Sequence, residues 1–133
     1  MHAGKLNQVL IQCIMLLAGA LSGPLPAFGG TTYTANPDNY LAKLKTLKPG
    51  SHLRLIPGDY KDGLPIQYLL GTAQAPITIS GPDSGPRPVF VARPRHNTIS
   101  IINSSYITLR NLDLDGRNLP VDGLKCEGHA DWA

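Results

Sequence analysis

Short segments in which apolar and polar residues alternate dominate the stretch from Ile99 to Cys126, and they constrain the fold more than any other feature. Side chains of a strand point alternately to its two faces, so each segment predicts a strand that is apolar on one face. No segment is long enough to bury a core alone. Only Arg110 and Asn111 separate two of them, which predicts a sharp corner in the chain. The segments are residues 99–101, 107–109, 112–114 and 124–126.

The same pattern occurs earlier in the chain, with a similar grouping. Residues 64–66, 77–79 and 89–91 form a first group of three, residues 99–101, 107–109 and 112–114 form a second, and residues 124–126 open a third. The first group repeats after 35 residues and the second after 25. Such periods are typical of a solenoid, whose cross-section stays the same from coil to coil while the loops between its strands vary in length. The alternative is an antiparallel sandwich with two-residue hairpins, for which Asp115-Gly116 and Asp122-Gly123 are the candidates.

One short amphipathic helix is expected ahead of these strands. Asn36-Pro37-Asp38 has the residues of a helix start, and Pro49-Gly50 ends the element. Between them, four apolar residues fall on one face. We expect this helix to cover the open end of the strand stack, and packing on the side of a sheet is the alternative. The apolar residues are Tyr40, Leu41, Leu44 and Leu47.

Residues 1–29 have the pattern of a secretory signal peptide. Lys5 makes the start basic, and an apolar run extends from Val9 to Leu21. Ala27 and Gly29 place small residues where a signal peptidase reads, so we expect cleavage after Gly29. The run is shorter than the roughly twenty residues that span a bilayer, and a retained anchor is the alternative. The sequence thus predicts a secreted or periplasmic protein with no stable membrane anchor, whose residues 30–133 form one domain.

The charge and composition exclude some classes of partner and structure. The chain has 12 Lys and Arg residues against 9 Asp and Glu residues, a net charge of +3. These basic residues are not gathered in one stripe or along one helix, as in nucleic-acid-binding domains. We therefore expect no binding to nucleic acid. The 14 Gly and 12 Pro residues predict many turns and little helix.

Several phrases of the sequence resemble the amino-terminal coils of right-handed parallel β-helix proteins, where a coil is one full turn of the chain. The resemblance is to the pectate-lyase-like group, nearest its chondroitinase-B-like and alginate-lyase-like branch, and it extends over about residues 31–130. It implies an all-β fold of incomplete coils with a short capping helix. The phrases are Leu47-Lys-Pro-Gly50, Pro57-Gly-Asp-Tyr60, Gly71-Thr-Ala-Gln-Ala-Pro-Ile-Thr-Ile79, Asn103-Ser-Ser-Tyr-Ile-Thr-Leu109 and Asp122-Gly-Leu124.

The resemblance implies an activity for a whole protein of this kind, but not the residues that carry it. Polysaccharide lyases of the group remove a proton beside a uronate carboxylate, which Ca²⁺ or an Arg neutralises. Their working residues lie in middle coils, so no catalytic residue is assigned to this chain. We therefore expect an exported fragment of a polysaccharide-acting protein, a lyase or hydrolase on acidic glycans, that is inactive alone. A carbohydrate-binding or cell-surface adhesive solenoid without catalysis is the alternative.

Acidic residues late in the chain are the candidates for a metal site. Asp113 and Asp115 point the same way from one predicted strand, and carboxylates from neighbouring coils could share a Ca²⁺ ion, which the resemblance also implies. The alternative is that they are solvated carboxylates that keep a sheet edge soluble. Lys125 is likewise either a base beside a groove or a solvated strand lysine. The candidate ligands are Asp113, Asp115, Asp122 and Glu127.

Two coils and one further strand are fewer than a solenoid needs, because a coil buries its faces only against its neighbours. The sequence then reaches Trp132, where the next strand is due, and shows no closing cap. We therefore expect a truncated chain that associates through its open carboxy-terminal coil. The alternative is a small solenoid that is completed by oligomerisation.

Overall fold

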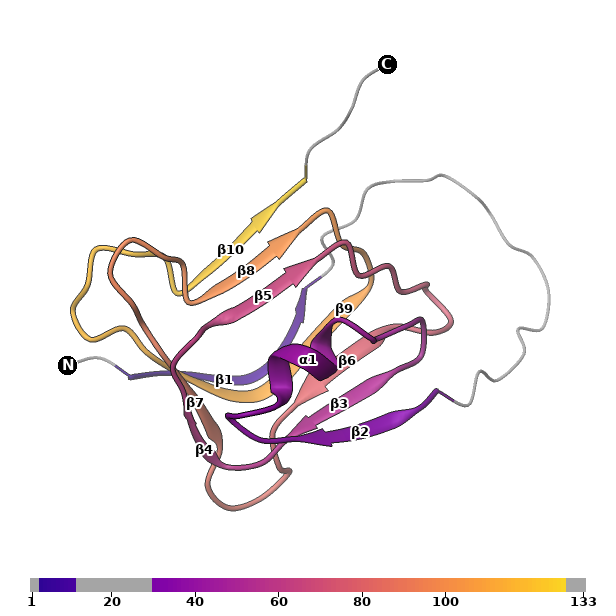
Figure 1. The fold of residues 1–133 in the computed structure, drawn as a ribbon, viewed down its shortest axis with the longest axis horizontal. Helices are drawn as coiled ribbons and strands as arrows, with labels where there is room; N and C mark the ends of the chain where they lie inside the picture. The colour runs from indigo at the N-terminus through magenta and orange to yellow at the C-terminus, as the bar shows by residue number, and fades with distance from the viewer. Residues whose placement is uncertain (1–2, 12–29, 129–133) are drawn as a thin grey trace.

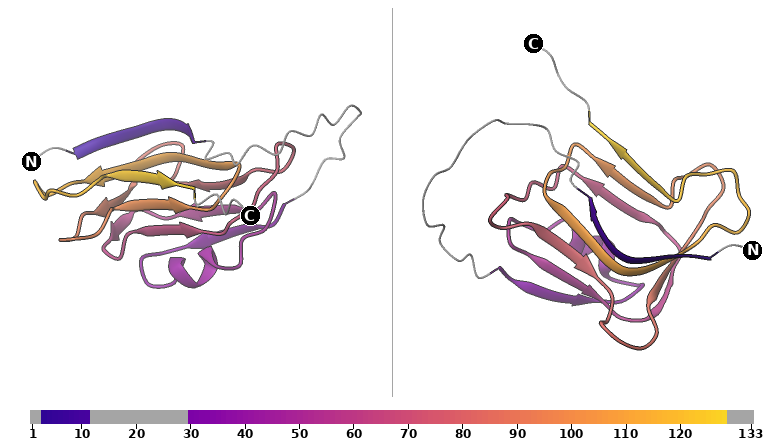
Figure 2. Two further views of the ribbon diagram at one scale, coloured as in Figure 1. Left: turned by 90° about the horizontal axis from the view of Figure 1, so that it is seen from above. Right: turned by 180° about the vertical axis from the view of Figure 1, so that it is seen from behind.

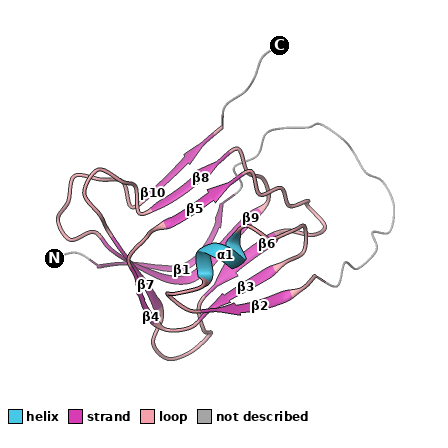
Figure 3. Ribbon diagram, in the orientation of Figure 1, coloured by secondary structure: helices cyan, strands magenta, loops and turns pink. Residues whose placement is uncertain are grey.

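The structure, a computed structural model, describes residues 3–11 and 30–128. These residues form an all-β fold of parallel sheets with one short helix (Figures 1 and 3). The elements are β1 (Ala3–Ile11), β2 (Thr32–Ala35), α1 (Tyr40–Leu44), β3 (His52–Leu55), β4 (Gly58–Tyr60), β5 (Leu64–Gln67), β6 (Ile77–Ser80), β7 (Pro88–Val91), β8 (Ile99–Ile102), β9 (Ile107–Asp115) and β10 (Leu124–Glu127).

The strands from β2 to β10 pair only in parallel. In the larger sheet β2, β3 and β6 pair in this order, and β6 pairs with the first half of β9. β7 pairs with the second half of β9, and β4 pairs with β7. The smaller sheet has the order β10-β8-β5. Because parallel neighbours require long connections between strands, this pairing excludes the antiparallel sandwich.

The register of the smaller sheet agrees with the predicted repeat. Leu64 pairs with Ile99, 35 residues on, and Ile99 pairs with Leu124, 25 residues further. The larger sheet repeats with different separations, since His52 pairs with Thr78 and Thr78 with Thr108. Loops of different length therefore join strands that return to the same positions.

The predicted corner at Arg110 and Asn111 lies within a single strand, β9. Asn111 has a φ of 56°, in the left-handed region that Asn tolerates better than most residues. The bend lets residues 107–110 pair with β6 and residues 113–115 pair with β7. One strand thus contributes to both halves of the larger sheet.

The core consists of apolar side chains that stack from strand to strand. Leu53, Ile79 and Leu109 are fully buried and in register, as are Ile66 and Ile101. By analogy with the other segments, the first and last residues of 89–91, Val89 and Val91, were expected to face inward, and this expectation is wrong. Phe90 is the buried residue, because it lies in register with Tyr60 and Leu114, whereas Val89 and Val91 are half-buried.

Helix α1 begins later than predicted, at Tyr40. The side chain of Asn36 instead accepts hydrogen bonds from the backbone N–H groups of Asp38 and Asn39, at 2.9 and 3.1 Å, which shapes a turn ahead of the helix. Tyr40 and Leu44 are buried, as the predicted apolar face requires. Figure 2 shows α1 at the end of the strand layers opposite β1.

The predicted leader is described only over Ala3–Ile11, which forms β1. Its backbone pairs with β9 in antiparallel fashion, from Ala3 beside Asp115 to Ile11 beside Ile107. Most of the predicted apolar run, the cleavage position after Gly29 and residues 129–133 lie outside the described residues. The signal peptide and its cleavage stay predictions.

Cys126 shares a register column with Ile66 and Ile101 but is exposed. The two isoleucines are fully buried because strands and loops pack over them. β10, in contrast, pairs with β8 on one side only among the described residues. Alternation in the segment 124–126 predicts an inward, buried Cys126, and this prediction is wrong.

Candidate functional site

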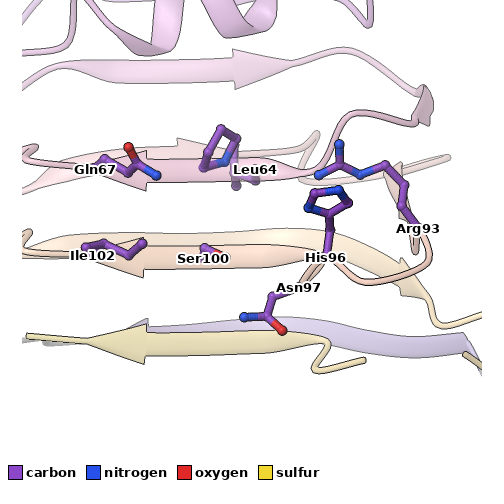
Figure 4. Close-up of a pocket in the computed structure, with 8 residues that line it drawn as sticks. Leu64, Gln67, Arg93, His96, Asn97, Ser100 and Ile102 are labelled. Atoms are coloured by element: carbon purple, nitrogen blue, oxygen red, sulfur yellow. The ribbon is translucent and has the colours of Figure 1, made fainter. Parts of the chain in front are cut away.

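A polar pocket lies on the outer face of the smaller sheet and extends along β5 and β8 (Figure 4). We call it the β5–β8 pocket. Its volume is about 170 Å³, smaller than the roughly 300–1,000 Å³ typical of sites that enclose a whole small molecule. It is lined by Leu64, Pro65, Gln67, Arg93, His96, Asn97, Ser100 and Ile102.

Strand alternation presents half of this lining to solvent. In β5 the buried residues are Leu64 and Ile66, so Pro65 and Gln67 face outward. In β8, residues 99 and 101 are buried, and Ser100 and Ile102 lie on the outer side. Since Pro65 pairs with Ser100, the two strands present these side chains next to each other.

The turn between β7 and β8 supplies the charged groups. The backbone N–H of His96 donates to the carbonyl of Arg93 at 3.4 Å, and Arg95 takes a φ of 64°. This tight turn places the guanidinium of Arg93 and the imidazole of His96 next to each other at the mouth of the pocket (Figure 4).

Gly63 makes room for Arg93. A Cβ at Gly63 would lie 2.7 Å from Nη2 of Arg93, and the φ of Gly63 is 71°, so a larger residue would be strained and would displace the guanidinium. The carbonyl of Gly63 accepts a hydrogen bond of 2.5 Å from the Tyr40 hydroxyl. Burial raises the pKa of Tyr40 to about 12, so this hydroxyl remains a donor at neutral pH. Gly63, which leaves room for Arg93, is thus held in place by a hydrogen bond from a buried side chain of the core.

The β5–β8 pocket favours an anionic or neutral polar ligand. None of its eight lining residues is acidic. Among the described residues, no carboxylate lies within salt-bridge distance of Arg93. A guanidinium, two amides, a hydroxyl and an imidazole offer mostly hydrogen-bond donors, which suit carboxylate and hydroxyl oxygens.

The structure places two of the predicted metal ligands on the second half of β9, near backbone or basic partners. Asp113 lies 3.7 Å from Nη1 of Arg87, an ion pair too long for a hydrogen bond, and its Oδ1 is buried without a hydrogen bond. Oδ1 of Asp115 accepts from the backbone N–H of Arg117 at 3.1 Å.

The other two predicted ligands lie before and at the end of β10. Asp122 is exposed in the preceding loop, and Oε1 of Glu127 lies 2.6 Å from Nζ of Lys125. Glu127 raises the pKa of Lys125, first through this hydrogen bond, whereas a general base needs a lowered one. Within residues 3–11 and 30–128, no three His, Cys, Asp or Glu side chains form a group that could hold a metal ion.

In the sequence, residues 93–97 have the composition of a turn between two predicted strands, which does not by itself single out Arg93 and His96. The signal was the sequence Arg-Pro-Arg-His-Asn, which gathers three basic-type side chains and one amide between two predicted strands. Alternation within β5 and β8 also predicted that Ser100 faces outward. The sequence alone does not show that the turn places Arg93 and His96 beside Ser100, because this depends on the conformation of the loop.

A second cavity, of about 270 Å³, lies on the outer face of the larger sheet, and we call it the β3–β9 cavity. His52, Arg54, Ser80 and Arg110 are its central residues, and Nε2 of His52 lies 2.6 Å from Oγ of Ser80. Partial burial lowers the pKa of His52, and the charges of Arg54 and Arg110 lower it further. The other lining residues are Thr34, Leu55, Ile56, Pro57, Gly81, Pro82 and Asp83.

We expect the full chain to lose stability as the pH falls from about 7.5 to about 5, partly through His52. The unfolded chain takes up this proton at the ordinary pKa of about 6.5, whereas the folded chain holds a lower pKa. The unfolded state therefore binds more protons between the two values, and the contribution of His52 is complete above about pH 6.5 and lost below it. Thermal unfolding at several pH values measures this loss. His52→Gln should flatten the dependence, and an unchanged slope would contradict the assignment.

No helix in the described part of the chain has the length and apolar character needed to cross a bilayer. Comparisons with protein-family models, with curated proteins and with solved structures find no match for this chain.

Proposed function

We propose that this chain is an exported amino-terminal part of a right-handed parallel β-helix protein, and that it binds an acidic polysaccharide in the β5–β8 pocket. The parent protein would be a lyase or hydrolase on acidic glycans, and the chain alone would bind without catalysis. The observation that carries the proposal is the adjacent pair Arg93 and His96 in a pocket without an acidic residue (Figure 4).

Two features support the β-helix part of the proposal. All pairings among β2 to β10 are parallel, and each strand position is occupied again after 20 to 35 residues. Left-handed residues also stand at the corners, at Asn103 with a φ of 46° and at Asn111 with a φ of 56°. A chain that winds in one direction requires such corners and long returns to the same sheet.

The pocket's size and position support a polymeric ligand. A volume of about 170 Å³ suits one sugar-sized group rather than an oligosaccharide, so the neighbouring units of a polymer would lie outside the pocket on the outer face of the sheet. The exposed side chain of Lys125 lies in register with Ser100, one strand beyond the pocket. Nζ of Lys125 lies 2.6 Å from Oε1 of Glu127, so this pair offers a neighbouring sugar unit a donor and an acceptor rather than a free positive charge.

Arg93 provides the neutralising charge in this proposal. A guanidinium can bind a uronate carboxylate with two parallel hydrogen bonds. The resemblance also implies that Ca²⁺ could neutralise the carboxylate. Binding through Ca²⁺ and binding through Arg93 can be distinguished by a chelator. Chelation of divalent ions would abolish binding through Ca²⁺, whereas binding through Arg93 would persist.

Arg93→Gln is expected to weaken binding of the full chain to polygalacturonate, alginate or dermatan sulfate by roughly ten- to hundredfold. This range corresponds to the loss of a hydrogen bond to a charged group, about 1.5–3 kcal/mol. Isothermal titration calorimetry measures it, with EGTA present in a parallel series. Unaltered thermal unfolding of the variant would show that the loss is local.

Arg95→Gln is the matched control, because Arg95 is exposed in the same turn but does not line the pocket. It should retain wild-type affinity. Equal binding of neutral dextran, or equal losses from both variants, would contradict the proposal. Release of an unsaturated product that absorbs in the ultraviolet would contradict the inactivity of the chain alone.

A further inference from the structure

We infer that the β3–β9 cavity is a binding site for a single oxyanion, and that it is separate from the β5–β8 pocket. The anion would be held by Arg54 and Arg110, with Ser80 between them. The ligand class is a carboxylate, sulfate or phosphate group. The two sites lie on different sheets and share no lining residue.

Strand register brings the two guanidinium groups to the same place. Arg54 pairs with Ser80, and Ser80 pairs with Arg110, so the three side chains leave the same outer face of consecutive strands β3, β6 and β9. Neighbouring strands are about 4.8 Å apart, which places the two arginines about two strand spacings from each other. An oxyanion above Ser80 is within reach of both long side chains.

The arginines are not neutralised by the rest of the described chain. No carboxylate in that part lies within salt-bridge distance of either guanidinium. Nε of Arg110 is buried and makes no hydrogen bond. A buried donor of a charged group without an acceptor is costly, and such groups in folded proteins generally have a partner. An anion in the cavity would supply that acceptor.

The remaining polar groups define the charge of the site. Asp83 lies at the edge of the cavity, and its Oδ1 accepts a hydrogen bond of 3.3 Å from Nδ2 of Asn111. Ser80 offers a hydroxyl, which already contacts His52 at 2.6 Å. With two arginines against one carboxylate, the cavity has a net positive charge even while His52 is neutral. Protonation of His52 adds to it.

The test uses the full chain at low salt and titrates it separately with sodium sulfate, inorganic phosphate and galacturonate. We expect saturable binding of at least one of them, followed by NMR chemical shifts of His52 and by calorimetry. Preference for sulfate or phosphate identifies a free inorganic ion, and preference for galacturonate identifies the carboxylate of a sugar. No saturable binding of any of the three would overturn the inference.

Arg54→Gln and Arg110→Gln should each weaken the binding by at least about tenfold. Arg54 is exposed, so its variant is expected to fold even if the Arg110 variant does not. Arg95→Gln, whose side chain lines neither the pocket nor the cavity, should leave this affinity unchanged. Because the two sites share no lining residue, the anion titration followed at His52 and the glycan titration of Arg93→Gln can fail independently. Binding that survives both Arg54→Gln and Arg110→Gln would overturn the inference.

Sulfate affinity should rise as the pH falls through the titration of His52, because its charge does not change in this range. Arg54 on β3, Arg110 on β9 and Asp83 in the loop after β6 are the charged groups that face the ring. His52→Gln should remove the pH dependence while binding at pH 7.5 persists. A pH dependence that is unaltered in His52→Gln would overturn the placement of the anion beside Ser80 and His52.

Discussion

Phe90→Ala is expected to lower the free energy of unfolding by about 3–5 kcal/mol, the usual cost of removing a buried phenylalanine. The ring is fully buried, 5.0 Å from the ring of Tyr60 and 6.1 Å from that of Tyr40. These three rings connect α1, β4 and β7, so the substitution leaves a cavity where three elements meet. Urea unfolding of the full chain, followed by circular dichroism, measures the loss.

Val89→Ala is the matched control for Phe90→Ala. Val89 is half-buried on the neighbouring position of the same strand, so its truncation should cost within about 1 kcal/mol. The two variants also distinguish the two faces of β7. If Val89→Ala cost more than Phe90→Ala, Val89 rather than Phe90 would face the core, and the described register would be wrong.

The strand β7 illustrates how far alternation alone predicts this fold. Most of the residues that were predicted to face inward are buried. The sequence identifies them because polar residues such as Ser100 and Thr108 lie between them. In Pro-Val-Phe-Val every residue is apolar, so periodicity does not choose a face. The pairing of Tyr60 with Phe90 makes that choice, and it depends on residues thirty positions apart.

The repeat of the strand segments predicted parallel pairing, and the short gap between two of them predicted the corner. This two-residue gap is Arg110 and Asn111, and Asn accepts the left-handed conformation observed there. The start of α1 was not predictable from Asn36 alone. Its side chain accepts two backbone N–H groups in a turn, and the same residue type serves helix starts and turns.

The candidate sites were less predictable than the fold, because each combines side chains from distant segments. Arg54 and Arg110 are separated by two returns of the chain to the same sheet, and only the register places them on either side of Ser80. The acidic candidates Asp113 and Asp115 were selected because they are close in sequence. In the structure, one faces Arg87 and the other caps a local turn. Proximity along the chain therefore pointed to these acidic residues, whereas the strand register brings together arginines from distant segments.

Removal of the predicted leader, residues 1–29, would remove β1 and expose one edge of β9. In the structure, β1 covers it with backbone pairs from Ile107 to Asp115 (Figures 1 and 2). An uncovered strand edge presents unpaired N–H and C=O groups and is a template for another chain. The antiparallel pairing with β1 also indicates that the edge accepts an added strand without steric hindrance.

We therefore expect residues 30–133 to associate in a concentration-dependent manner, and more strongly than the full chain, in which β1 covers the edge of β9. Size-exclusion chromatography with light scattering measures both over a range of concentrations. In residues 30–133, Thr108→Lys should reduce the association, because a lysine on an edge strand disfavours edge-to-edge pairing. Thr78→Lys is the matched control, since β6 lies between β3 and β9 in the same sheet and has no free edge. A monomer at every concentration, or equal effects of the two lysines, would show that the edge of β9 does not mediate association.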